Sequence, residues 1–224
     1  MGQKVNPNGF RIGVNKDWNS QWYADKKSFA KYILEDHKIR EVINKKYAQC
    51  GISKVVIDRT DRKLTVNIYA SKPGMLIGVK GAEIEVIKKA IAKIASDKEI
   101  TINIREVKRP DIDATLVAQS IAAQLEKRVA FKRACKMAIQ KTMKAGAKGV
   151  KVMVSGRLNG AEIARSEHFH EGSLPLQTLR ANIDYGFAIA ETTFGVIGVK
   201  VWVYNGDIIA KKSAKEEVNS DVNA

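Results

Sequence analysis

The first half of the chain shows a helical pattern followed by two alternating segments. Apolar residues recur at helical spacing between residues 29 and 48, and Gly51 follows as a helix stop. This pattern predicts an amphipathic helix and allows a break near His37. Residues 54–59 and 63–70 then alternate between apolar and polar side chains, as the two strands of a hairpin do.

A glycine loop comes next in the chain. Pro73 ends the second strand, and a short helical turn leads into the loop. A helix with apolar residues on one face then covers residues 84–94, and a third strand covers residues 100–107. The loop itself consists of Gly78, Val79, Lys80 and Gly81.

The loop glycines favour contact with phosphate. Because Gly78 and Gly81 have no Cβ, the backbone there can adopt turn conformations and approach a sugar-phosphate chain closely. The following helix would direct its free N–H groups and the positive end of its dipole at the same chain. A nucleotide-binding P-loop fits poorly, since Ala82 and Glu83 stand where Lys and then Ser or Thr are needed. The loop therefore predicts binding to nucleic acid.

The second half of the chain predicts two helices followed by four strands. Pro110 interrupts the pattern, and Asp111 or Asp113 can cap a helix that carries Leu125. A second helix is expected at residues 129–145. The four strands are expected at residues 149–156, 162–171, 183–193 and 195–204.

Together these elements predict an α+β protein with two domains. The expected parts are an extended arm at residues 1–28, an RNA-binding domain at residues 29–109, a C-terminal two-layer domain of two helices on a four-stranded sheet at residues 110–207, and a disordered tail at residues 208–224. The arm has no clean period, but its aromatic residues favour docking onto RNA or protein. They are Trp18, Trp22 and Tyr23.

Composition agrees with a nucleic-acid partner. Lys and Arg number 39 against 24 for Asp and Glu, so the net charge is +15. Hydrophobic residues make up 45% of the chain, which indicates a folded protein. Cys50 and Cys135 lie too far apart in ordinary helical sequence to predict a disulfide framework or a zinc site. Neither a signal peptide nor a membrane span is recognisable, so we expect a cytoplasmic protein.

The strongest charge asymmetry lies between residues 127 and 157, which include no Asp or Glu. At 100° per residue, the cations of the second helix of this half share one side, while Phe131, Ala134 and Cys135 share the other. A solvated helix face usually mixes charges to gain i,i+4 pairs of ~0.2–0.5 kcal/mol each. We therefore predict phosphate binding by this segment. Its candidate RNA-binding residues are Lys127, Arg128, Lys132, Arg133, Lys136, Lys141, Lys144 and Arg157.

Candidates for catalysis are few. His168 and His170 alternate along a predicted strand, near Glu167 and Glu171. A metal site needs three or four converging ligands, and no further residues supply them. Polar residues on an exposed or RNA-facing sheet surface explain this pattern better. We expect no catalytic residue, no metal and no cofactor.

The order of elements over about residues 38–108 resembles a KH domain of the prokaryotic, type II order. Such a domain has a three-stranded sheet with helices on one face, and its G-x-x-G loop clamps about four nucleotides of single-stranded RNA. Further segments resemble the bacterial small-subunit ribosomal protein S-three family, and this similarity extends from residue 1 to about residue 206. The segments are residues 1–9, 156–165 and 195–202.

This resemblance implies a structural component of the small-subunit head. It implies binding to small-subunit ribosomal RNA, contact with the S-ten and S-fourteen proteins, and a place at the messenger RNA entry channel. In the family, basic residues of the corresponding helix help to unwind structured message, and they match Lys132, Arg133 and Lys136. Lys132 keeps the charge of the Arg often found there but lacks its planar fork. Two alternatives remain: an enzyme acting on nucleic acid, such as an abasic-site lyase, and a free RNA-binding regulator.

Overall fold

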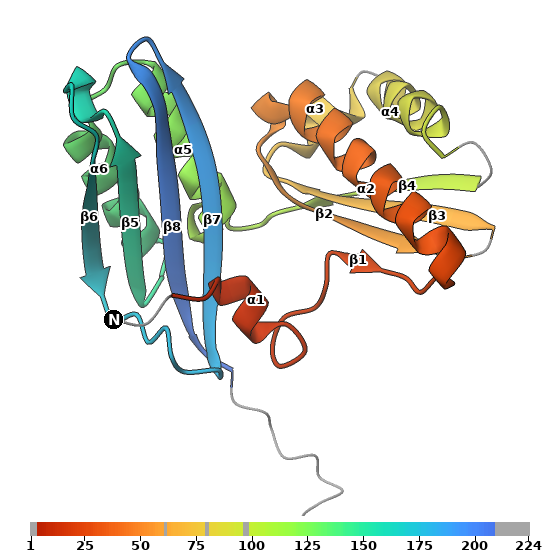
Figure 1. The fold of residues 1–224 in the computed structure, drawn as a ribbon, viewed down its shortest axis with the longest axis horizontal. Helices are drawn as coiled ribbons and strands as arrows, with labels where there is room; N and C mark the ends of the chain where they lie inside the picture. Colours follow the sequence, from red (N-terminus) through yellow and green to blue (C-terminus); the bar gives the residue numbers. More distant parts are fainter. Residues whose placement is uncertain (1–3, 61, 79–80, 96–98, 209–224) are drawn as a thin grey trace, which may run out of the picture.

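Two sheets of four strands, each with helices on one face, make up the molecule (Figure 1). The computed structural model describes residues 4–60, 62–78, 81–95 and 99–208. The predictions for Val79, for Lys80 and for a disordered tail after residue 208 fall outside these residues. The predicted α+β fold class is confirmed.

The N-terminal half follows the predicted order of elements. Its β2 and β3 are antiparallel, whereas β3 and β4 are parallel. Ile39 of α2 and Ile91 of α4 are buried in one core with Ile57 and Ile68 of the sheet, so both helices cover the same face. The elements are α2 (Lys26–Lys46), β2 (Ile52–Arg59), β3 (Lys63–Ala70), α3 (Pro73–Ile77), α4 (Ala82–Ala92) and β4 (Glu99–Glu106).

The C-terminal half has the predicted two helices on four strands. The strand order is β6-β5-β8-β7, and all neighbours are antiparallel. Alternate valines such as Val152 and Val201 are fully buried beneath the helices. Helix α5 can approach β7 closely because Gly186 has no Cβ, which would lie 2.2 Å from the Ala114 carbonyl oxygen. The elements are α5 (Ala114–Glu126), α6 (Phe131–Lys144), β5 (Gly149–Gly156), β6 (Arg165–Gly172), β7 (Ala181–Thr192) and β8 (Gly195–Asp207).

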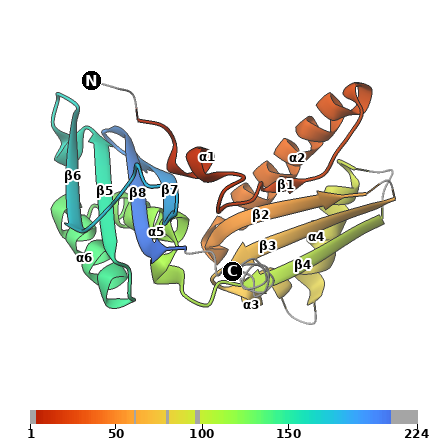
Figure 2. The same cartoon turned by 90° about the horizontal axis from the view of Figure 1, so that it is seen from below.

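The arm follows a defined path across both halves. Helix α1 (Pro7–Arg11) lies beside β7, and β1 (Ser20–Gln21) pairs with β2 in parallel, as Figures 1 and 2 show. Asn6 caps α1 by accepting a hydrogen bond from the Asn8 amide at 2.9 Å. The arm thus adds a two-residue strand to the three strands predicted for the N-terminal sheet.

Helix α2 runs without interruption past His37, so the break allowed by the sequence is absent. The reason is a buried cluster of charges on its inner face. Arg59 of β2 approaches Glu35 at 2.6 Å, and its Nε donates to Asp36 at 2.9 Å. The second Asp36 oxygen accepts a hydrogen bond from the Trp22 indole at 2.9 Å, which ties the arm to the helix. Polar residues at these positions therefore pair inside the fold and do not mark a helix end.

The two halves meet at the N-terminus of α5. Asp113 caps this helix by accepting from the Leu116 amide at 3.1 Å, and Ser53 of β2 donates to its other oxygen. Asp184 of β7 pairs with Lys16 of the arm at 3.0 Å and accepts from the backbone at the start of α5. Four segments, from the arm, β2, the start of α5 and β7, therefore share one hydrogen-bonded junction.

Candidate nucleic-acid interface

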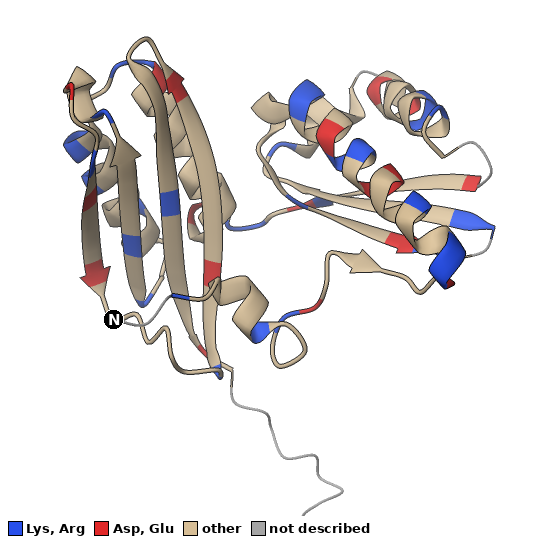
Figure 3. Ribbon diagram, viewed as in Figure 1, with Lys and Arg blue, Asp and Glu red and all other residues tan. Residues whose placement is uncertain are grey.

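Helix α6 presents its cations to solvent because its opposite face is buried. Phe131, Cys135 and Ile139 contribute to the core, and Thr142 satisfies its hydroxyl by donating to the Ala138 carbonyl at 3.0 Å. The helix is thus fixed to the sheet, and its exposed side carries Lys and Arg but no acidic residue (Figure 3). We call this side the α6 ridge; it comprises Lys132, Arg133, Lys136, Lys141 and Lys144.

Three members of the α6 ridge have no acidic partner among the described residues. Lys132, Arg133 and Lys136 are exposed, and none of them forms an ion pair within the residues that the structure describes. The Lys132 ammonium lies 6.0 Å from the centroid of the Phe131 ring, a contact that leaves its N–H groups available. Phosphates that bind here would release condensed counterions, so binding would weaken steeply as salt rises.

Lys141 differs from its neighbours. Its ammonium pairs with Asp111 at 2.9 Å, and Asp111 precedes α5 in the chain. The argument that no acidic residue is available to this segment is therefore wrong at Lys141, because the fold brings in an acid from outside residues 127–157. Both side chains are largely solvated, so the pair contributes little stability. The ridge is most positive at its N-terminal end.

The connection between α5 and α6 places two further candidates beside that end. Lys127 and Arg128 are exposed, and Arg128 has a φ of 60°. Such a left-handed conformation ends a helix and is usually left to glycine. The chain thus retains a charged side chain at a position where backbone geometry favours Gly.

Arg157 has a different environment from the α6 ridge. Its Nε donates to the Ala161 carbonyl at 2.9 Å, and its Nη1 donates to the Phe194 carbonyl at 3.2 Å. With Arg128 it lines a cavity of about 430 Å³ that also includes Glu126. Arg157 therefore holds two loops together, and only its remaining N–H groups are free for RNA.

The glycine loop has the predicted backbone around its undescribed centre. Gly78 has a φ of 69° and Gly81 a φ of 82°, and Gly81 caps α4. A Cβ on Gly78 would lie 2.8 Å from Cγ of Glu83. The Glu83 carboxylate accepts a hydrogen bond from the Tyr47 hydroxyl at 2.9 Å, which draws this acid toward α2.

The residues considered for catalysis do not converge. His168 and His170 are exposed on β6, the outer strand of its sheet. Across the described ranges no group of three or more His, Cys, Asp and Glu side chains could hold a metal ion. Burial, with a smaller effect of Glu167, raises the pKa of the Cys135 thiol to about 11. That thiol stays protonated at neutral pH and is unsuited to nucleophilic attack.

Sequence reasoning missed the open face of the C-terminal sheet. Lys200 and Trp202 of β8 point away from the helices, beside Lys151 of β5 and Tyr185 of β7. The sequence signal for this face was present in β8, where the buried residues Val199, Val201 and Val203 alternate with Lys200 and Trp202. Burial of Arg11 beside this face left no sequence signal, since its partners are backbone carbonyls.

Family descriptions match both halves of the chain. A KH domain description matches residues 38–112, and one for "Ribosomal protein S3, C-terminal domain" matches residues 121–203. Curated proteins named "Small ribosomal subunit protein uS3" are similar over nearly their full length. The protein of Clostridium botulinum (strain Okra / Type B1) is 57% identical over 98% of this chain and 100% of its own. Those of Clostridium tetani and Clostridium beijerinckii are 57% and 56% identical over the same shares.

Within the described ranges no helix combines the length and the apolar character that crossing a bilayer requires.

Proposed function

The chain belongs to the small ribosomal subunit protein uS3 family, and we propose that its α6 ridge acts on RNA within that subunit. It is a structural component of the cytoplasmic ribosome and not an enzyme. Ribosomal RNA and neighbouring ribosomal proteins are its partners. We further propose that it lines the messenger RNA entry channel and helps to position and unwind messenger RNA.

The observation that carries this proposal is the unpaired charge at the start of α6. Lys132, Arg133 and Lys136 are solvated cations on a helix whose other side is locked into a core. Flexible lysines that contact phosphates without reading bases suit a polyanion that changes sequence as it moves. A rigid support holds their positions while the strand passes.

The glycine loop supplies a second proposed contact. Gly78 and Gly81 take the left-handed conformations that a close backbone approach requires, and α4 begins at the loop. We assign this loop to ribosomal RNA, since a clamp on about four nucleotides suits a fixed partner. Contact with the S-ten and S-fourteen proteins is proposed from the family resemblance alone.

The test replaces Lys132→Ala, Arg133→Ala and Lys136→Ala together. We expect subunits to assemble but to translate messages with a stable hairpin more slowly, because strand separation loses its phosphate contacts. The dependence of log affinity for single-stranded RNA on log salt should become shallower by about 2, from three contacts of ~0.7 each. The rate of translation through the hairpin is measured in a reconstituted translation system with purified variant subunits.

A control of equal charge change uses Lys26→Ala, Lys27→Ala and Lys38→Ala on α2, all exposed and remote in the chain from α6. This control should read the hairpin at the normal rate. Equal hairpin reading by the α6 variant and the native protein would refute the unwinding role. Sucrose-gradient sedimentation gives an independent check, since a free regulator would appear outside the ribosomal fractions.

A further inference from the structure

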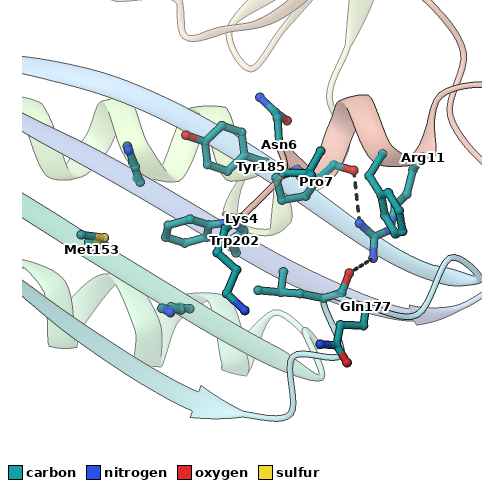
Figure 4. Close-up of a pocket in the computed structure, with 13 residues that line it drawn as sticks. Lys4, Asn6, Pro7, Arg11, Met153, Gln177, Tyr185 and Trp202 are labelled. Atoms are coloured by element: carbon teal, nitrogen blue, oxygen red, sulfur yellow. Dashed lines mark hydrogen bonds between the residues drawn. The ribbon is translucent and has the colours of Figure 1, made fainter. Parts of the chain in front are cut away.

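A cavity of about 540 Å³ lies between the arm and the open face of the C-terminal sheet (Figure 4). Pro7 and Arg11 of α1 form one side, and Tyr185 and Trp202 form the sheet side. We call it the arm cavity. It lies on the face of the sheet opposite α5 and α6, so it is separate from the α6 ridge. Its volume is in the range of pockets that hold small ligands, ~300–1,000 Å³.

The sheet side of the arm cavity is aromatic. The ring centroids of Tyr185 and Trp202 lie 5.4 Å apart at an interplanar angle of 50°. Both side chains remain partly exposed, and Figure 4 shows their rings side by side beneath the arm. Stacking of a nucleobase on such a ring contributes ~1–3 kcal/mol and does not depend on base identity.

The charge around this aromatic surface is entirely positive. Lys4, Lys151 and Lys200 line the arm cavity, and its lining includes no Asp or Glu. The Lys151 ammonium lies 5.5 Å from the centroid of the Trp202 ring. A cation is therefore already placed beside the stacking surface, where the phosphate of a stacked nucleotide would lie.

Buried Arg11 strengthens this positive field. Its guanidinium is 0% exposed and donates to four backbone carbonyls, those of Pro7, Leu176, Thr178 and Ala181, at 2.8–3.2 Å. No carboxylate pairs with it among the described residues. Carbonyl dipoles accept from four of its five N–H groups but leave its net charge uncompensated. An anion in the arm cavity would supply the missing counter-charge.

We propose that the arm cavity binds a nucleotide of single-stranded RNA, with the base on Trp202 and the phosphate between Lys151 and Lys200. Aromatic stacking combined with unpaired cations is the pattern of non-specific single-strand binding. An acidic peptide would use the lysines but would not need the exposed indole face. The proposal rests on the proposed function only in that RNA is the polyanion surrounding a small-subunit protein.

The test uses the full chain in the background of Lys132→Ala, Arg133→Ala and Lys136→Ala together with Val79→Asp and Lys80→Asp, which removes both the α6 ridge and the glycine loop from the measurement. Two fluorescein-labelled probes are titrated: octauridylate and an abasic ribose-phosphate oligomer of equal length. Trp202→Leu should weaken octauridylate binding at least about fivefold and leave the abasic probe unchanged. Lys151→Gln with Lys200→Gln should weaken both probes and make their salt dependence shallower.

The matched control is His168→Gln, which changes the same sheet face outside the arm cavity and should leave both affinities unchanged. Because Trp202 also packs on Tyr185, urea denaturation must show that Trp202→Leu is folded; the exposed Lys200→Gln change tests the site without that risk. Unchanged octauridylate affinity in the lysine variant would overturn the proposal. Tight binding of an octaglutamate peptide without binding of octauridylate would overturn it in favour of a protein partner. Neither outcome would change the result expected when the α6 ridge is tested by translation through a hairpin, so the two proposals fail separately.

Discussion

Two buried arginines, one in each half, have opposite electrostatic surroundings. Arg59 in the N-terminal sheet pairs with the carboxylates of Glu35 and Asp36, which neutralise its charge. Arg11 beside the C-terminal sheet donates only to carbonyls, which carry no net charge. The first arginine is therefore part of a closed core. The second maintains a positive potential at the surface above it.

The open faces of the two sheets differ in the same way. On the N-terminal sheet, Asn67 donates to one oxygen of Asp58 at 2.9 Å, and Asn103 donates to Asn67 at 3.1 Å, so this face is a hydrogen-bonded polar surface; the other Asp58 oxygen has no partner among the described residues. On the C-terminal sheet, Phe187 and Ile189 are 48% and 52% exposed. One two-layer architecture has thus produced a polar open face in the N-terminal half and an apolar open face suited to a partner in the C-terminal half.

Loss of the neutralised arginine should have the largest effect on stability. Arg59→Met leaves the buried Asp36 carboxylate without its cation and leaves Glu35 with only the Lys31 ammonium at 4.0 Å, so the free energy of unfolding should fall by about 3–5 kcal/mol. Urea denaturation measures it. Adding Glu35→Gln and Asp36→Asn to Arg59→Met should recover much of the loss. A smaller loss than that of Arg11→Met would remove the distinction between the two arginines.

Loss of the unpaired arginine should cost less. Arg11→Met removes the donors of four carbonyls, but those carbonyls can take up water once α1 separates from β7. We expect the free energy of unfolding to fall by about 1–3 kcal/mol. Lys4→Met, on the exposed neighbouring segment, should change it by less than about 0.5 kcal/mol. An Arg11→Met loss no larger than that of this control would argue against a docked arm.

The smallest effect on stability is expected from Asp113, at the junction of the two halves. Burial raises the pKa of Asp113, the Ser53 hydrogen bond opposes the rise, and nearby Asp184 adds to it. Stability from this group is therefore greatest below the unfolded pKa of about 3.9 and is lost as pH rises through the higher folded pKa. Asp113→Asn keeps a capping side chain without titrating. Relative to the native protein, this variant should gain stability from pH 3 to pH 7.

Denaturation midpoints across that pH range provide the measurement. Asp113→Ala serves as the control: it also removes the titrating carboxyl, and because it removes the cap as well, it should be less stable than Asp113→Asn by about 0.5–2 kcal/mol at every pH. A difference between the Asn variant and the native protein that stays constant with pH would contradict the assigned effect of burial.

Most of the fold was predictable because its helices and strands carry strong periodic patterns. Strand β3 has the predicted bounds, and α6 lies within the predicted helix. The path of the arm was not predictable, since Arg11 is ordered by carbonyls about 165 residues away in the chain. The domain boundary near residue 109 stays a prediction.

The candidate site was predictable in part for the same reason. Helical geometry placed Lys132, Arg133 and Lys136 on one exposed side, and the structure has them there. It could not reveal Asp111 beside Lys141, because that contact joins different elements. RNA contact by the candidate residues stays a prediction that the α6 substitutions test.

The docked arm also imposes an order on synthesis. Residues 4–21 are made well before the carbonyls that hold Arg11, which belong to a segment made 165 residues later. At ~5–20 residues per second, the arm waits about 8–33 s for its binding site to be translated. During that interval the N-terminal half can fold, while the arm is exposed to nascent-chain chaperones and proteases. Docking of the arm therefore cannot occur before Ala181 has been synthesised.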